Sequence, residues 1–174
     1  MVTTPEQFEE KITERIKAGH EQEANYRFGA DVRKYFVEKA KLELPEDFLK
    51  RWLVYANEGK FTPEQVEKEF PGFLEDFKWQ LVRGYLMQKF DLKVTREDIQ
   101  AAAESYVAYQ YAMYGMAGVP QNLIQSSAEN LMQDENQYRR LEEQCEDNKA
   151  IARVREEVTL QTKKISQEKF RELK

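Results

Sequence analysis

Residues 73–90 read FLEDFKWQLVRGYLMQKF, and this stretch decides the fold class. At about 100° per residue, apolar side chains lie on every side of a helix here. They are Phe73, Leu74, Phe77, Trp79, Leu81, Val82, Tyr85, Leu86, Met87 and Phe90. A helix that is apolar on all sides is expected at the centre of a protein. We predict an all-α fold in which this helix is the most buried, with no sheet larger than a short strand pair.

Upstream, the first forty residues predict one long helix. Thr4, Pro5 and Gln7 form a helix start, and no internal proline interrupts the chain up to about Ala40. The first half carries one narrow apolar stripe, made of Phe8, Ile12 and Ile16. The second half is apolar on two faces. We therefore expect the second half to pack between two partners and the first half to project.

Two helices should connect this long helix to residues 73–90. One follows Pro45, ends near residue 59 and carries Phe48, Leu49, Trp52 and Leu53 on one face. The other begins at the second Thr-Pro start signal, Thr62-Pro63. It should be short, because Phe70-Pro71-Gly72 is expected to break it.

Downstream, the sequence predicts a helical hairpin followed by a charged helix. Thr95 and Asp98 cap a helix that reaches Gly115. Residues 115–120, GMAGVP, are the clearest loop, and another helix starts at about Gln121. The charged helix then carries an apolar stripe, and Ser166 caps a last short helix after an extended piece at 158–160. The stripe consists of Tyr138, Leu141, Cys145 and Ala152.

The composition excludes several function classes. The chain of 174 residues has a net charge of -5 with interleaved signs, which argues against direct nucleic-acid binding. It has no apolar run long enough to span a membrane and no signal peptide at its start, so a cytoplasmic location is expected. His20 and Cys145 are single, and we expect Cys145 to be a small core residue. We expect no catalytic residue, no metal and no cofactor.

Three stretches resemble the C-terminal domain of bacterial trigger factor. Residues 44–49, LPEDFL, resemble its "LPES-L" helix opening, and residues 94–99, VTREDI, are similar to its "V-T-x-E-E-L" helix start. Residues 154–173 resemble its closing pattern, which ends here in ISQEKF at 165–170. Residues 4–16 also fit the end of its linker and its first helix. The order and spacing of these motifs extend the resemblance over nearly the whole chain.

The resemblance implies an all-α domain with a long N-terminal helix, a helical body and projecting helical-hairpin arms. It implies a ribosome-associated chaperone that cradles unfolded or nascent polypeptides. The family docks on the ribosome through a "GFR-x-GK-x-P" loop and isomerises prolyl bonds in an FKBP-type domain, neither of which this sequence contains. We therefore expect residues 1–174 to be a single helical chaperone domain, either an excised fragment or a shortened relative. Ribosome contact would need a domain absent here.

The segment 106–116 is the first candidate for client contact. On a helical wheel Tyr106, Met113 and Tyr114 share the face of Ile99 and Ala103, which is expected to be core. Three residues lie off this face, and we predict that they line a groove with the long first helix near the hairpin tip: Tyr109, Tyr111 and Met116. Plain core packing is the alternative. The second candidate is the stripe Phe8, Ile12 and Ile16.

We predict an ATP-independent chaperone domain without enzyme activity. One rival is a helical adaptor with a single defined partner, and another is the helical core of a periplasmic chaperone. An enzyme domain is the weakest alternative, since no acid–base or nucleophile cluster occurs. Client identity and arm geometry are not determined by the sequence, and a homodimer stays open.

Overall fold

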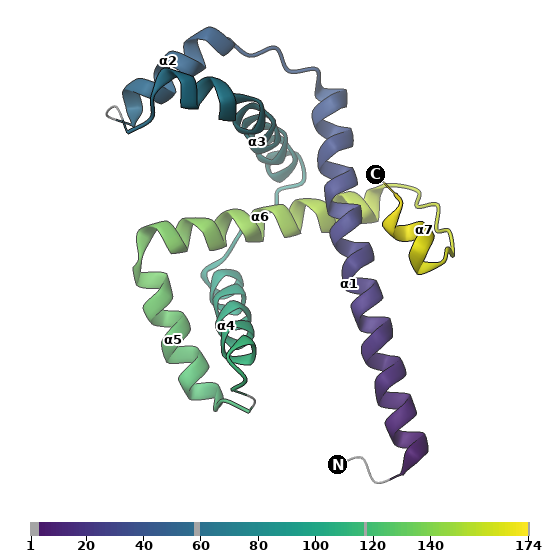
Figure 1. Ribbon diagram of the computed structural model, residues 1–174. Helices are drawn as coiled ribbons and strands as arrows, with labels where there is room; N and C mark the ends of the chain where they lie inside the picture. The colour runs from purple at the N-terminus through teal and green to yellow at the C-terminus, as the bar shows by residue number, and fades with distance from the viewer. Residues whose placement is uncertain (1–3, 58–59, 117, 174) are drawn as a thin grey trace.

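The computed structural model describes residues 4–57, 60–116 and 118–173 of the chain, and this part contains helices but no strand (Figure 1). The all-α prediction is therefore confirmed. In chain order the helices are α1 (Pro5–Ala40), α2 (Glu46–Ala56), α3 (Pro63–Lys89), α4 (Arg96–Met113), α5 (Gln121–Gln133), α6 (Glu135–Glu157) and α7 (Gln167–Arg171). The predicted end of α2 near residue 59 lies outside the described residues.

Threonine side chains start three of these helices, as the sequence predicts. Thr4 accepts a hydrogen bond from the backbone N–H of Gln7 at the start of α1. Thr62 and Thr95 form complete capping boxes with Gln65 and Asp98, which start α3 and α4. These contacts satisfy backbone N–H groups that have no partner inside the helix, so each helix start is determined locally.

α1 is divided into a projecting half and a packed half. Residues 4–26 are exposed, whereas burial begins at Arg27 and reaches its maximum at Val32. The second half contacts both α3 and α6. At the crossing with α6, a Cβ atom on Gly29 would lie 3.4 Å from Cδ1 of Ile151, so a glycine allows the two helices to approach closely. The predicted division of α1 is confirmed.

α3 runs without interruption through Pro71, so the predicted break at residues 70–72 is wrong. An internal proline removes one helix hydrogen bond and costs about 3 kcal/mol. Packing against α2 offsets this cost, because Val66 and Phe70 are buried and Lys50 of α2 forms an ion pair of 2.8 Å with Glu67. Tertiary contacts on both sides of the proline therefore keep the helix continuous.

α3 is also less buried than the apolar pattern of residues 73–90 predicts. It has more buried side chains than any other described helix, among them Trp79, Val82 and Leu86. However, Leu81 is 42% exposed and Tyr85 is 61% exposed. α1 and α6 contact α3 but leave one face of the helix in water, so the expectation of burial on all sides is wrong.

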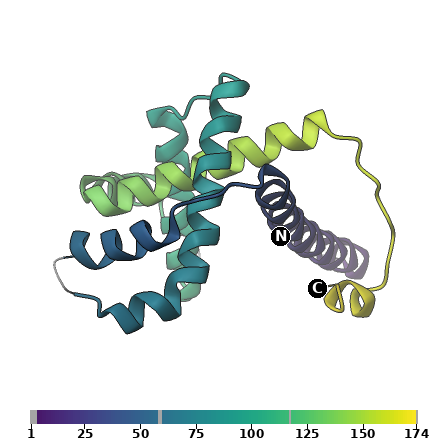
Figure 2. The ribbon, with the colours of Figure 1, turned by 90° about the horizontal axis from the view of Figure 1, so that it is seen from above.

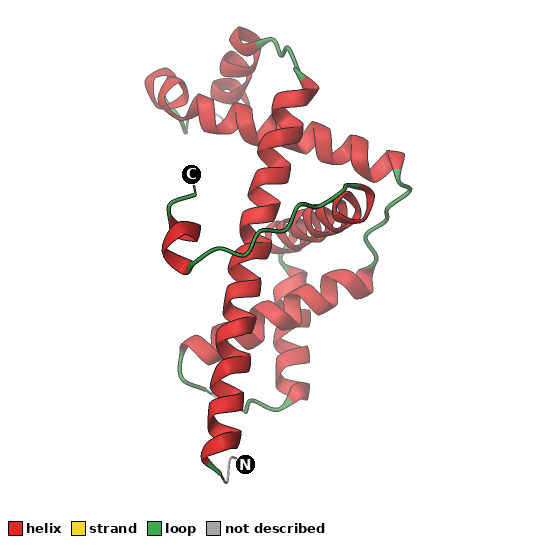
Figure 3. Cartoon of the chain, turned by 90° about the vertical axis from the view of Figure 1, so that its right-hand side faces the viewer, coloured by secondary structure: helices red, strands yellow, loops and turns green. Residues whose placement is uncertain are grey.

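α6 contributes residues to two separate hydrophobic cores and connects them. Ala150 and Val154 pack with α1 and α3, whereas Leu141 and Cys145 pack with α4 and α5. Ala152, predicted on the buried stripe, is exposed, because the contact switches from the hairpin to the α1–α3 core along the helix. Figures 1 and 3 show α6 crossing between these two parts of the protein.

Two arms project to the same side of α6. The hairpin arm consists of α4, α5 and their loop, and the α1 arm consists of residues 4–26 (Figures 1 and 3). Among the described residues, α1 contacts neither helix of the hairpin. Figure 2 places the C-terminal segment and α7 on the opposite side of α1 from the hairpin. The predicted projecting arms are thus confirmed.

Candidate functional site

Both arms carry large exposed apolar side chains, and others lie on α2, on α3 and in the C-terminal segment. The hairpin arm carries a group that we call the hairpin surface, made of Tyr106, Tyr109, Met113, Tyr114, Met116 and Leu123. The α1 arm carries the α1 stripe, in which Phe8, Ile12 and Ile16 are exposed at four-residue spacing. Neither arm packs these side chains on another element, so both remain available for contact.

The largest difference between the predicted and the observed site lies in the distal part of α4. Tyr106, Met113 and Tyr114 were expected in the core with Ile99 and Ala103, but all three are exposed. α6 explains the difference: Ile99 and Ala103 pack in the core that includes Leu141 and Cys145, near the base of the hairpin. The same helical face extends past α6 toward the tip, where no partner covers it.

Tyr111 is less exposed than Tyr109 and Met116, the two residues predicted to line the same groove. It is only partly exposed and packs against the α4–α5–α6 core. Its hydroxyl lies 3.1 Å from the Oγ atom of Ser127, so it joins α4 to α5. Tyr109 and Met116 are 61% and 51% exposed, as expected for residues off the core. Among the described residues, α4, which carries Tyr109 and Tyr111, does not contact α1.

A cleft lies where α1 crosses α6. It has a volume of about 650 Å³ and is lined by residues of both helices together with Trp79 of α3. Tyr26, Arg33 and Ile151 line this cleft, and near it the Arg155 guanidinium lies 4.3 Å from the ring centroid of Phe28. The sequence did not predict this cleft, because a crossing of distant segments leaves no local signal.

The sequence also did not predict an exposed aromatic group on α2. Phe48, Trp52 and Tyr55 are exposed, whereas Leu49 is buried and Leu53 is half-buried. The sequence placed Phe48 and Trp52 on the same face as the two leucines. The spacing of four and three residues from Phe48 to Tyr55 was the available signal for a separate exposed stripe.

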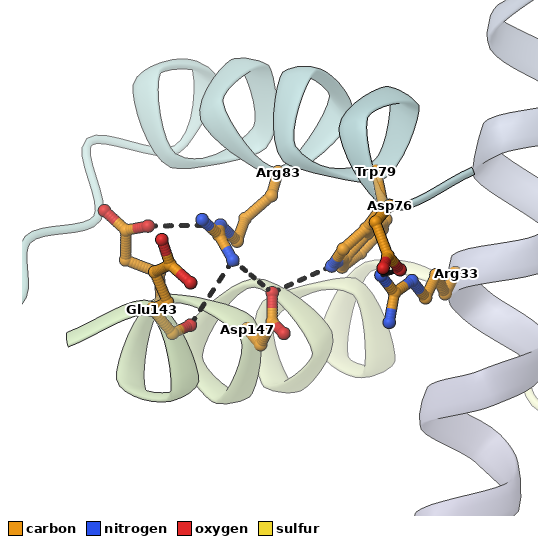
Figure 4. A network of polar contacts seen from close by, with 7 residues as sticks. Arg33, Asp76, Trp79, Arg83, Glu143 and Asp147 are labelled. Atoms are coloured by element: carbon orange, nitrogen blue, oxygen red, sulfur yellow. Dashed lines mark hydrogen bonds and ion pairs between the residues drawn. The ribbon is translucent and has the colours of Figure 1, made fainter. Parts of the chain in front are cut away.

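A polar network fixes α3 on α6 and so holds the body that carries the arms (Figure 4). Arg83 is buried, and its Nε and Nη1 atoms lie 3.1 Å from Glu146 and 2.9 Å from Asp147. Trp79 donates its indole N–H to the same Asp147 oxygen at 2.8 Å. On the α1 side, Arg33 pairs with Asp76 at 2.6 Å. Three helices are thereby locked together.

A second polar group fixes the base of the hairpin arm. The Lys149 ammonium lies 2.6 Å from Oδ2 of Asp98, and the Thr95 N–H donates to the same carboxylate. These two contacts, the first the stronger, hold the pKa of Asp98 below its ordinary value. Cys145 lies beside them with its Sγ atom 3.6 Å from the Asp98 carbonyl oxygen, and burial raises the pKa of its thiol.

Over residues 4–57, 60–116 and 118–173, no group of three or more His, Cys, Asp and Glu side chains could hold a metal ion. None of the helices described there is both long and apolar enough to cross a membrane. The chemistry displayed by the two arms is that of aromatic rings, thioethers and branched aliphatic groups.

Comparison with known proteins identifies the family. A family described as "probable trigger factor, C-terminal domain" matches residues 24–174, which is most of the chain, and this domain is not a catalytic one. The α1 stripe lies before the matched residues. No curated protein and no solved structure matches the chain. The family match, the all-α architecture and the projecting arms agree, and the chain belongs to the trigger factor C-terminal domain family.

Proposed function

We propose that this domain is an ATP-independent chaperone that holds unfolded or nascent polypeptides through weak, dispersed apolar contacts. One observation carries the proposal: two arms project to the same side of α6, and each displays apolar side chains that no other element covers. The family supports a chaperone function and the binding of nascent polypeptides. We expect the domain to work in the cytoplasm and to reach the ribosome only through another domain.

The chemistry of the arms suits clients of many sequences. Met113 and Met116 have flexible, polarisable side chains that adapt to different shapes. Tyr109 and Tyr114 add apolar area while their hydroxyl groups stay in water. Partial burial of each such side chain contributes on the order of 0.5–2 kcal/mol. Several contacts together would give micromolar binding, about -8 kcal/mol after the cost of association.

Client contact is assigned to both arms. On the hairpin arm Tyr109 and Met116 contact the client directly, and Tyr111 contributes mainly by holding α4 on α5 through Ser127. On the α1 arm Phe8, Ile12 and Ile16 form the second contact. Because α1 contacts neither hairpin helix in the part of the chain that the structure describes, a client segment must span the space between the arms or use one arm at a time.

The first experiment changes Tyr109, Met113 and Met116 together to Ser. Client binding should weaken about tenfold or more, because three exposed apolar contacts are lost. The melting temperature should change little, since these side chains are exposed in the free domain. Binding would be followed by fluorescence anisotropy with an unfolded client protein, and stability by thermal unfolding.

Matched controls decide what a loss of binding means. Leu81→Ser with Tyr85→Ser removes exposed apolar side chains from α3 instead of the arms and should leave binding unchanged. Tyr111→Ser should lower the melting temperature, because it breaks the contact with Ser127. If the hairpin triple variant binds clients normally, the hairpin assignment is wrong, and an α1 variant with Phe8, Ile12 and Ile16 changed to Ser becomes the test of the other arm.

Aggregation assays separate a chaperone from an adaptor with one partner. The domain at several-fold excess should suppress the aggregation of several unrelated denatured proteins without ATP. An adaptor would leave these proteins unaffected and bind one folded partner more tightly. Unchanged aggregation of every client would therefore overturn the chaperone proposal.

A further inference from the structure

The cleft at the crossing of α1 and α6 is separate from the surfaces assigned to client contact. Its walls come from residues 25–33 of α1 and 144–156 of α6, together with Trp79, and include no residue of the hairpin surface or the α1 stripe. Its volume of about 650 Å³ is in the range of ligand sites in proteins. The charged and polar groups of its walls determine which chemistry it can bind.

Arg155 is a cation in the wall of this cleft that has no carboxylate partner among the described residues. Its side chain is half-buried. Every other buried or half-buried arginine in the described part of the chain pairs with at least one Asp or Glu side chain; these are Arg27, Arg33, Arg83 and Arg153. Arg155 alone in this group is left with a free charge that faces a cavity.

Phe28 of α1 holds the Arg155 side chain in place. The guanidinium carbon lies 4.3 Å from the centroid of the Phe28 ring, which is the geometry of a cation–π contact. Stacking uses one face of the guanidinium and leaves the N–H groups at its edge free. Such an edge can bind a carboxylate through two parallel hydrogen bonds. Half-burial also strengthens a pair at this site relative to one in open water.

The carboxylates in the walls of the cleft are already paired with other arginines. Asp147 lies 2.9 Å from Arg83, and Glu156 lies 2.9 Å from Arg153. Glu156 is also largely exposed, so water screens its charge. A ligand ammonium would find no free carboxylate here, whereas a ligand carboxylate would find Arg155. The cleft is therefore complementary to an anion.

Neutral groups make the rest of the cleft suitable for a peptide backbone. Asn25, Gln144 and Asn148 contribute side-chain amides that form no hydrogen bond with another described residue. An amide both donates and accepts hydrogen bonds, as a peptide group does. Gly29 and Ala152 have small side chains and leave room for a chain to approach the two helices closely.

We propose that this cleft binds a segment of a partner polypeptide through a carboxylate. Arg155 binds the carboxylate, and the neighbouring amides bind the backbone of the segment. The carboxylate belongs either to the C-terminus of the segment or to an Asp or Glu side chain. This site uses a different chemistry from the apolar arms, and the inference does not rest on the proposed chaperone function.

The experiment compares three fluorescent peptides with one neutral sequence of Ala, Leu and Ser on the intact chain. The first has a free C-terminal carboxylate, the second has an amidated C-terminus and one central Asp, and the third is amidated and has Asn in place of that Asp. At least one of the first two should bind about tenfold more tightly than the third. The one that does identifies the source of the carboxylate. Its advantage should shrink between 50 and 500 mM salt.

Variants of the cleft locate the binding. Arg155→Gln should remove the tenfold preference, and Arg155→Lys should retain only part of it, because an ammonium lacks the planar fork. Arg140→Gln is the matched control, since Arg140 is an exposed arginine of the same helix outside the cleft. Ala152→Trp fills the cleft from an exposed position and should block all binding there. Thermal unfolding checks that each variant folds, and Ala152→Trp decides the question if Arg155→Gln does not fold.

The possible outcomes separate this inference from the proposed function. Equal binding of the three peptides, absence of binding at millimolar concentration, or unchanged binding in both Arg155→Gln and Ala152→Trp would overturn it. Loss of binding when Tyr109, Met113 and Met116 are changed to Ser would place the site on the hairpin arm and also overturn it. A carboxylate preference that is lost in Arg155→Gln and kept in Arg140→Gln supports it. Aggregation assays judge the chaperone function independently, so either proposal can fail alone.

Discussion

The indole N–H of Trp79 lies 2.8 Å from Oδ1 of Asp147, and this hydrogen bond connects the most buried aromatic ring of α3 to α6 (Figure 4). The same oxygen accepts a hydrogen bond from Arg83. Asp147 therefore joins the two helices through one carboxylate. Since α6 also carries the hairpin, this contact positions one arm relative to the other.

Arg83→Met should destabilise the domain by about 2–3 kcal/mol, because it leaves Asp147 and Glu146 without their buried counter-ion. Urea unfolding followed by tryptophan fluorescence measures this loss. The control is Arg33→Met, which breaks a more exposed ion pair with Asp76 and should cost about 1 kcal/mol or less. Equal losses in the two variants would contradict the role assigned to Arg83.

Asp98→Asn should lower stability at pH 7, because it removes the charge that pairs with Lys149. The folded-state pKa of Asp98 is below its ordinary value, so its contribution is present above the unfolded pKa of about 3.9. This contribution is lost as the pH falls through the folded pKa. The difference between variant and wild type should therefore shrink in acid below about pH 4.

The control for Asp98 is Glu129→Gln, which changes an exposed acid on the same hairpin. Its unfolding curves should match those of the wild type at pH 7 and at pH 3. A difference for Asp98→Asn that is the same at pH 7 and pH 3 would contradict the ion-pair explanation.

Cys145 should react slowly with a thiol reagent in the native protein. It is buried beneath the hairpin, and burial, with help from Asp98, raises the pKa of its thiol. We expect the reaction at pH 8 to accelerate at least about a hundredfold in denaturant, because access then no longer depends on opening of the fold. Rapid native labelling would show that the α4–α6 contact opens readily.

Backbone amides in residues 8–26 should exchange with solvent much faster than those in residues 28–40. The first half of α1 is exposed throughout, and an isolated helix of this length is only marginally stable in water. The second half is held by α3 and α6. Hydrogen exchange read by NMR or mass spectrometry should show a boundary near Arg27. Uniform protection along α1 would indicate that another contact holds the projecting arm, such as a second copy of the chain.

Local sequence was sufficient for the helix starts and for the division of α1. A Thr cap at residues 4, 62 or 95 acts within one helical turn, so its effect does not depend on the rest of the fold. The narrow stripe at Phe8, Ile12 and Ile16 likewise predicts a helix with no broad packed face. The exposed Tyr109 and Met116 follow from their positions on the wheel.

Tertiary structure alone decided which apolar face is covered and where. Pro71 stays inside α3 because α2 packs on the helix before it and α1 and α6 pack on the helix after it, contacts between segments that local propensity does not describe. Tyr106 shares a helical face with Ile99, yet only Ile99 is buried, because α6 crosses the hairpin at its base. Helical periodicity identifies a face, but burial along that face depends on how far the neighbouring helix extends.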